Sequence, residues 1–143
     1  SAMPDSVFVQ NFTELINTLR QVNGRKFLMS YTCYTGIYGP DKEIIINVKK
    51  KIDFIQLMAY FDDTPSMKTL FNDYSTIFPP DKINIGVKAG KQSGCTSIQE
   101  VIKLSKWNKS KGGMMLWTLN RDYPSFTGQV PWYWANNIWK SIT

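Results

Sequence analysis

Short apolar runs alternate with amphipathic stretches along the whole chain. Four runs of seven or eight residues are dense in aliphatic and aromatic side chains, at residues 26–32, 53–60, 82–88 and 113–119. Runs of this length and content predict buried strands. Apolar residues recur at helical spacing over 6–23, 41–50, 66–74, 96–104 and 132–142. The pattern therefore predicts one helix followed by four strand–helix units.

The four predicted strands repeat at a nearly constant interval. With Leu28, Ile55, Ile85 and Met115 as strand centres, the spacings are 27, 30 and 30 residues. Consecutive strand–helix units have this pitch, and strands that are apolar on both faces belong to a parallel sheet covered by helices. We therefore predict an α/β fold with four parallel strands in a single domain over residues 1–143. Within that range, Ser1-Ala2-Met3 reads as a cloning remnant followed by a start methionine.

Four parallel strands fit two architectures. Half of a TIM-type (β/α)8 barrel would leave two sheet edges and half of the barrel interior open. A flavodoxin-like open sheet is the alternative, and it calls for helices on both faces and a phosphate-binding loop. No Gly-rich loop of that kind follows any of the four runs. The half barrel is therefore the prediction.

Composition excludes several kinds of chemistry. The chain has no histidine and only two cysteines, Cys33 and Cys95, so it cannot form a Ser–His or Cys–His nucleophile pair or a His-containing metal site. We expect no metal and no cofactor, and the count leaves open whether the two cysteines pair. The net charge of +6 is scattered over lysines and fits no nucleic-acid-binding motif, so we expect no nucleic-acid partner. No apolar run is long enough for a membrane span.

Two of the runs resemble strands of a known family. Asp53-Phe-Ile-Gln-Leu-Met-Ala-Tyr60 resembles the sixth strand of family 18 glycoside hydrolases, the chitinases and their inactive relatives. The run from Gly112 to Asp122, with its Gly-Gly-x-Met-x-Trp pattern, resembles the eighth strand. Residues 11–20, 25–31 and 82–87 are similar to the family's fourth helix, fifth strand and seventh strand. The resemblance implies strands five to eight, the C-terminal half of a chitinase-like barrel.

The resemblance also implies sugar-binding residues. Tyr60 matches the tyrosine that hydrogen-bonds the N-acetyl oxygen of the substrate, and Trp117 matches the tryptophan beneath the sugar at the cleavage point. Gln56 and Met58 share a strand face with Tyr60, because side chains alternate along a strand, and would shape the same pocket. Further candidates near the ends of the fifth and eighth strands are Tyr31, Asn120 and Arg121. Packing in a barrel core is the alternative role for such side chains.

The same resemblance implies that the catalytic acid is missing. Family members use substrate-assisted hydrolysis, in which the acetamide attacks the anomeric carbon while a Glu protonates the leaving oxygen. That Glu ends an Asp-x-x-Asp-x-Asp-x-Glu motif, which this chain lacks. The three glutamates, Glu14, Glu43 and Glu100, fall on predicted helices. Many active members have Asp where this chain has Phe61, so we expect no catalytic residue here beyond Tyr60 as the N-acetyl-orienting group of a completed barrel.

Two functions follow from these expectations. The chain is either the C-terminal part of a chitinase-like glycosidase acting on glycans such as chitin, inactive alone, or a naturally truncated, non-catalytic glycan-binding or assembly module. The expected ligand is an N-acetylglucosamine oligosaccharide. The open sheet edges predict a second half barrel or a homodimer as partner. No signal peptide is recognisable, although the resemblance favours a secreted protein.

Overall fold

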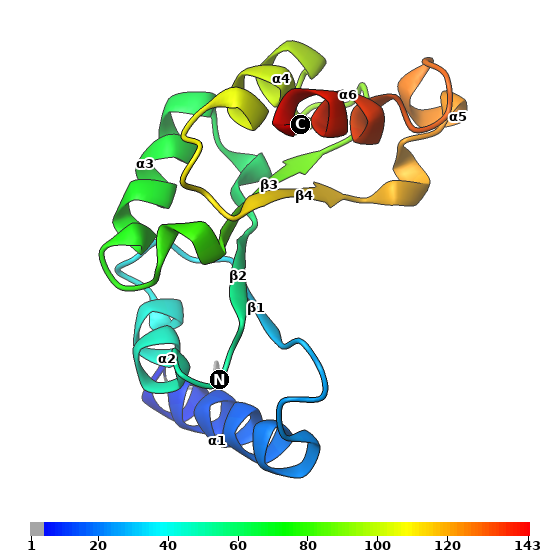
Figure 1. The fold of residues 1–143 in the computed structure, drawn as a ribbon. Coiled ribbons are helices and arrows are strands. Elements are labelled where there is room, and N and C mark those ends of the chain that lie inside the picture. The colour runs from blue at the N-terminus through cyan, green and yellow to red at the C-terminus, as the bar shows by residue number, and fades with distance from the viewer. Residues whose placement is uncertain (1–4) are drawn as a thin grey trace.

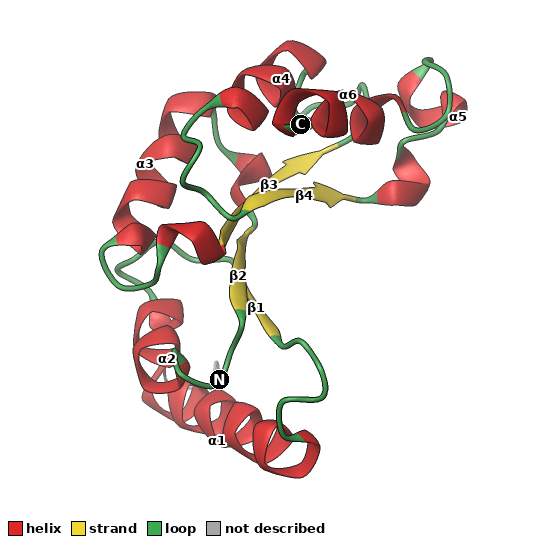
Figure 2. Cartoon of the chain, viewed as in Figure 1, coloured by secondary structure: helices red, strands yellow, loops and turns green. Residues whose placement is uncertain are grey.

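Four strands form one parallel sheet in the order in which they occur along the chain. In the computed structural model, which describes residues 5–143, they are β1 (Ser30–Cys33), β2 (Phe54–Leu57), β3 (Ile83–Lys88) and β4 (Gly113–Trp117). Each crossover between neighbours contains a helix (Figure 2). This succession of units confirms the predicted α/β half barrel. Ser1-Ala2-Met3 lie outside the described residues.

The long helices line one side of the sheet. They are α1 (Asp5–Asn23), α2 (Pro40–Val48), α3 (Thr64–Ser75), α4 (Ile98–Lys106) and α6 (Tyr133–Ile142). Figure 1 shows them along the outer side of a curved sheet, with α1 beside α2 and α4 beside α6. The short α5 (Pro124–Thr127) projects beyond the end of β4. No helix within residues 5–143 covers the inner, concave side.

Alternate residues along the strands point to a buried face of the sheet and to a solvent-exposed face. Ile55, Leu57 and Ile85 are fully buried beneath the helices. Gln56 and its register partner Asn84 point to the other side and are partly exposed. Burial of the first set drives folding through the removal of apolar surface from water. The second set forms the concave face, which corresponds to half of a barrel interior.

The first strand begins later than the hydrophobic pattern predicts. Leu28, taken from the sequence as a strand centre, is 80% exposed and precedes β1. The chain here is held by side chains instead of by a sheet ladder, because Arg20 donates to the Phe27 carbonyl and Asp53 accepts from the Met29 amide. The apolar run at residues 26–29 therefore belongs to the segment that connects α1 to β1. The prediction of Leu28 as a strand centre is wrong.

Two other boundaries differ from the pattern. β2 ends at Leu57 and is followed by a single 3-10 turn, η1 (Ala59–Phe61), where the sequence predicts strand up to residue 60. Helix α4 begins at Ile98, two residues after the start of the predicted range 96–104, and is capped by Ser97 with Glu100 completing a capping box. The Thr96 hydroxyl instead accepts a hydrogen bond from the Lys88 amide, which fastens the loop to the end of β3.

An apolar groove runs beside each edge of the sheet. The groove between α1 and β1 has a volume of about 390 Å³ and includes Phe12, Leu15 and Tyr31. The groove between β4 and α6 has a volume of about 190 Å³ and includes Leu116 and Trp139. Among residues 5–143, β1 and β4 each pair with one strand only, so both edges of the described sheet retain unpaired backbone groups.

Candidate functional site

Aromatic side chains gather where the strands end. Tyr34 follows β1, Tyr60 and Phe61 lie in η1, and Trp117 ends β4. The ring centroids are 6.0 Å apart for Tyr34 and Phe61, 4.6 Å for Phe61 and Tyr60, and 6.2 Å for Tyr60 and Trp117. These four rings form a continuous line, the aromatic row, at the carboxyl edge of the sheet. Parallel barrels place their binding residues at this edge.

Tyr60 and Trp117 are the centre of the row. Their rings are nearly parallel, with an interplanar angle of 17°. Tyr60 is 3% exposed, whereas Trp117 is 48% exposed. A half-exposed indole backed by a buried phenol presents a flat apolar surface to solvent, and its position is fixed by the ring beneath it.

The Tyr60 hydroxyl has no hydrogen-bond partner among the described residues. By contrast, the hydroxyl of Tyr31 donates to Asp41 and that of Tyr74 donates to the Thr35 carbonyl. Burial, and then the nearby Tyr34, raise the pKa of Tyr60, so its phenol keeps its proton at neutral pH. The O–H group can therefore donate a hydrogen bond to a ligand acceptor.

Polar side chains line the concave face beside the row. The strand register sets Thr32, Gln56 and Asn84 in one line across the sheet, and it sets Lys88 next to Trp117. The Gln56 amide donates to the Ser30 hydroxyl at 3.4 Å. An aromatic surface beside amide, hydroxyl and ammonium groups suits a ligand with one apolar face and polar edges.

Gln56, Tyr60 and Trp117, three of the residues expected at a sugar site, lie at the concave face or its carboxyl edge. Gln56 lies on the concave side, and Tyr60 and Trp117 are stacked on each other at the carboxyl edge. Met58 is partly exposed between β2 and η1. Tyr60 reaches Trp117 from η1, so strand alternation, which would have required β2 to continue to residue 60, is not what places it there.

Tyr31 faces the opposite side of the sheet. It is paired in register with Ile55 and is buried beneath the helices. Its hydroxyl donates to Asp41 Oδ1 at 2.5 Å, and Asp41 Oδ2 accepts from the amides of Tyr34 and Thr35 and from the Thr35 hydroxyl. Burial is the main cause that raises the pKa of Tyr31, followed by the hydrogen bond to Asp41. Tyr31 therefore supports the loop that carries Tyr34 and does not line the concave face.

Of the residues that follow β4, Asn120 is exposed to solvent, whereas Arg121 and Asp122 hold neighbouring segments in place. Asn120 is exposed in η3 (Leu119–Arg121). The Arg121 side chain donates to Gln92 Oε1 at 2.5 Å and lies over the Phe126 ring. Asp122 is fully buried and accepts from the amides at the start of α6. Arg121 thus ties the loop after β3 to the segment after β4.

The three glutamates lie on helices, as expected from the sequence. Glu14 is in α1, Glu43 in α2, and Glu100 in the capping box of α4, where it also accepts from the Thr64 hydroxyl. Asp63 caps α3 by accepting a hydrogen bond from the Ser66 amide.

Further properties constrain what the site can do. Within residues 5–143 no group of three His, Cys, Asp or Glu side chains is arranged to hold a metal ion. In the same range no helix has the length and apolar character that a bilayer span requires. Cys33 and Cys95 are both free thiols. Burial raises the pKa of the Cys33 thiol, so it is not activated as a nucleophile.

Sequence reasoning missed two members of the aromatic row. Tyr34 comes directly after β1, and Phe61 was noted only as a departure from the family pattern. Both follow strands of the predicted sheet, so the rule that sites lie at carboxyl strand ends would have found them. The Gln92–Arg121 contact left no sequence signal, because the two residues lie 29 positions apart.

The fold is similar to that of solved glycan-processing enzymes. Endo-beta-N-acetylglucosaminidase from Cordyceps militaris in its apo form superposes with a TM-score of 0.72 at 15% identity. A double mutant of the same enzyme, in complex with fucosyl-N-acetylglucosamine-Asn, gives a TM-score of 0.70 at 15% identity. Each comparison covers 92% of this chain and 50% of the neighbour, so the chain spans about half the length of these enzymes. No family model matches the chain, and no curated protein matches its sequence.

Proposed function

We propose that this chain is the C-terminal part of a chitinase-like, family 18 glycoside hydrolase barrel and binds N-acetylglucosamine-containing glycans on its concave face. One observation carries the proposal: the stacked pair of Tyr60 and Trp117 at the carboxyl edge of a parallel half barrel, with the Tyr60 hydroxyl unpaired among the described residues. The similar solved structures support the proposal. Both are endo-beta-N-acetylglucosaminidases, and one is a complex with fucosyl-N-acetylglucosamine-Asn.

Each proposed site residue has a physical role. The exposed face of Trp117 stacks on the apolar face of a pyranose ring. The Tyr60 hydroxyl donates to the acetamide oxygen and fixes the orientation of the N-acetyl group. Gln56 and Met58 line the floor beneath that group, and Asn120 contacts the polar rim of the sugar from η3.

The proposal includes no hydrolysis by the isolated chain. Protonation of the leaving oxygen requires a carboxylic acid held at the reacting bond, and the Asp-x-x-Asp-x-Asp-x-Glu motif is absent from the sequence. Glu100 is held by Ser97 and Thr64 and serves α4. A non-catalytic glycan-binding or assembly module is the alternative. Mixing the chain with a half barrel that carries the motif separates the two, because only the enzyme interpretation predicts recovered chitinase activity.

A second half barrel is the proposed partner. Both edges of the sheet are unpaired within residues 5–143, and each lies beside an apolar groove. In a closed barrel the β4 edge of one half meets the β1 edge of the other, and α6 packs beside α1. The exposed apolar residues Leu15 and Leu19 on α1, and Trp139 on α6, fit that contact. The simplest such partner is a second copy related by a twofold axis.

Fluorescence tests the glycan site. Titration of the chain with chitotetraose should change tryptophan emission, and Trp117→Ala should weaken binding about tenfold, because a lost stacking contact is worth ~1.4 kcal/mol. Trp139→Ala is the matched control, since this indole is also exposed but lies on α6, and both variants are compared at a concentration at which the chain is monomeric. Equal affinities for the two variants would remove the glycan-site proposal.

Sedimentation velocity tests the partner. A homodimer should appear as the concentration rises, and Trp139→Lys should shift the equilibrium to monomer by placing a charge in the apolar contact. A chain that remains monomeric at high micromolar concentration, alone and with a motif-bearing half barrel, would contradict this part of the proposal.

A further inference from the structure

The aromatic row has two exposed surfaces that meet at a buried ring. Tyr60 is buried and contacts both the half-exposed Trp117 and Phe61. Phe61 is 58% exposed, and Tyr34, which it contacts in turn, is 71% exposed. Among the described residues no ring contact joins Trp117 to Phe61 or Tyr34. Phe61 and Tyr34 therefore form a separate surface, which we call the second platform.

The second platform leaves apolar surface in water at the carboxyl edge of the sheet. The ring centroids of Tyr34 and Phe61 are 6.0 Å apart with an interplanar angle of 77°, the edge-to-face arrangement that aromatic pairs favour. A role in core packing would bury these rings, and more than half of each is exposed. Single exposed apolar side chains are common on protein surfaces, whereas adjoining ones mark sites of interaction.

The backbone beneath the second platform is held in place by hydrogen bonds. Asp41 Oδ2 accepts from the Tyr34 amide at 2.8 Å and from the Thr35 amide at 2.7 Å. The Tyr74 hydroxyl donates to the Thr35 carbonyl at 2.8 Å. Phe61 lies in the η1 turn. A ligand therefore meets rings that are already positioned, which reduces the entropy lost on binding.

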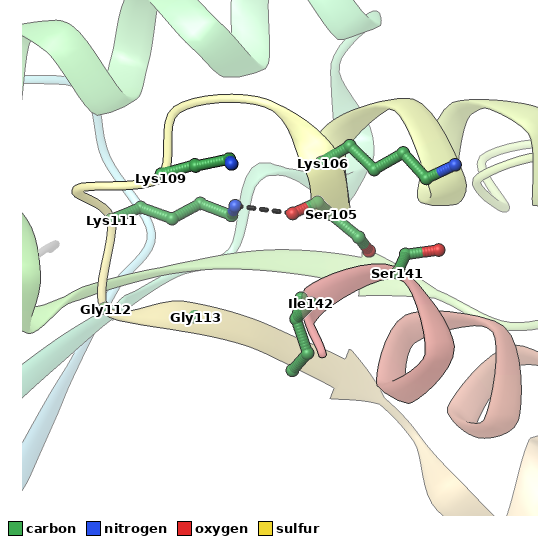
Figure 3. Close-up of a pocket in the computed structure, with 8 residues that line it drawn as sticks. All are labelled: Ser105, Lys106, Lys109, Lys111, Gly112, Gly113, Ser141 and Ile142. Atoms are coloured by element: carbon green, nitrogen blue, oxygen red, sulfur yellow. Dashed lines mark hydrogen bonds between the residues drawn. The ribbon is translucent and has the colours of Figure 1, made fainter.

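The pocket at the opposite, amino end of β4 has a different character. Its volume is about 440 Å³, and none of the described residues that line it is aromatic. Figure 3 shows the Lys111 ammonium bonded to the Ser105 carbonyl, and the same group donates to the Trp107 carbonyl. Lys111 therefore terminates α4, and this pocket offers a sugar ring no stacking surface.

We propose that the second platform is a second sugar subsite, so that the ligand of this chain is a run of linked sugar units and not a single N-acetylglucosamine. The inference rests on the proposed function, because the first subsite is the glycan site at Trp117 and Tyr60. Trp117 ends β4 and Tyr34 follows β1, so the bound glycan crosses the carboxyl edge from β4 towards β1.

Each ring of the row has its own task in this arrangement. One sugar unit stacks on Trp117 and presents its acetamide oxygen to the Tyr60 hydroxyl. The neighbouring unit stacks on the exposed ring of Phe61, and Tyr34 contacts its edge. The Tyr34 hydroxyl makes no hydrogen bond to another described residue, so it can bond to a hydroxyl of that second unit.

A comparison of sugar lengths tests the second subsite. N-acetylglucosamine, chitobiose and chitotriose are titrated into the chain, at a protein concentration at which it is monomeric, and the Trp117 indole N–H is followed by NMR. We expect chitotriose to bind at least about tenfold more tightly than the monosaccharide, the effect of ~1.4 kcal/mol from a second stacking contact. Saturable binding with equal affinity for all three sugars would overturn the second subsite and leave the proposed glycan site standing. No binding of any sugar would remove both.

Matched double variants identify the residues responsible. Y34A/F61A should weaken chitotriose binding about tenfold and change the affinity for the monosaccharide by less than about twofold. Y38A/F27A is the control, since it removes the same two ring types from exposed positions outside the row. Equal losses of chitotriose affinity in the two variants would overturn the proposal. So would an equal loss of monosaccharide and chitotriose affinity in Y34A/F61A, because the two rings would then act only by supporting Tyr60.

Discussion

Asp41 organises the loop that carries Tyr34, and its removal gives the sharpest test of the structure. The carboxylate is 4% exposed and lies in the first turn of α2. It accepts four hydrogen bonds, one on Oδ1 from Tyr31 and three on Oδ2 from Tyr34 and Thr35. Asp41→Ala removes all four hydrogen bonds and leaves the hydroxyls of Tyr31 and Thr35 and the amides of Tyr34 and Thr35 without this acceptor.

The expected loss follows from the number and kind of these bonds. A hydrogen bond to a charged group contributes about 1.5–3 kcal/mol, and water entering the vacated space replaces part of it, so we expect Asp41→Ala to lower the free energy of unfolding by ~4 kcal/mol. In Asp41→Asn, the remaining side-chain oxygen can accept the three hydrogen bonds that Oδ2 accepts in the unchanged chain. The side-chain amide nitrogen takes the place of Oδ1 and can donate to the Tyr31 oxygen. We therefore expect a loss of only ~1–2 kcal/mol for Asp41→Asn.

Urea unfolding at pH 7 and fixed protein concentration measures both variants. A fixed concentration matters because any self-association would add to the apparent stability. At about 3 °C per kcal/mol for a chain of this size, Asp41→Ala should lower Tm by ~12 °C. If Asp41→Ala and Asp41→Asn differ by less than about 0.5 kcal/mol, the carboxylate does not organise the loop and the reasoning is refuted.

Three further predictions concern the frame around the site. Asp122→Ala should lower the free energy of unfolding by ~2–3 kcal/mol, measured in urea, because the amides of Trp134 and Ala135 lose their acceptor; a loss below ~0.5 kcal/mol would contradict this. Ser97→Ala should cost ~1 kcal/mol by opening the capping box, and an unchanged thermal midpoint would count against it. Hydrogen bonds from the Met29 amide and then from Arg20 hold the pKa of Asp53 below its ordinary value, so its contribution to stability is complete above about pH 5 and is lost as the pH falls through the folded pKa. Urea midpoints at pH 7 and pH 3 should therefore differ less for Asp53→Asn than for the unchanged chain, and equal differences would refute the assignment.

The order of elements could be predicted because each strand carries its own hydrophobic signal. Ile55, Ile85 and Met115 lie in or near the centre of observed strands at the predicted spacing. Leu28 failed because its apolar character belongs to a sheet edge, where nothing within the described residues covers it. Pattern alone cannot distinguish a residue buried by its own domain from one that is left for a partner surface.

Part of the candidate site could also be predicted from the sequence. The resemblance picked out Tyr60 and Trp117, and the structure brings the two rings together. Tyr31 was misjudged because its direction depends on strand register, and a shift of one residue moves a side chain to the other face.

Arg20, near the end of α1, anchors that helix to the segments that lead into β1 and β2. Its guanidinium donates to the carbonyls of Lys51, Gly24 and Phe27 and to the Asp53 carboxylate, all from a side chain that is 7% exposed. A version trimmed to begin at β1 would lose this anchor, together with the apolar cover that α1 gives to α2. Anyone who prepares shorter versions for crystallography or binding assays should therefore keep the whole of α1, and should expect an insoluble product when it is removed.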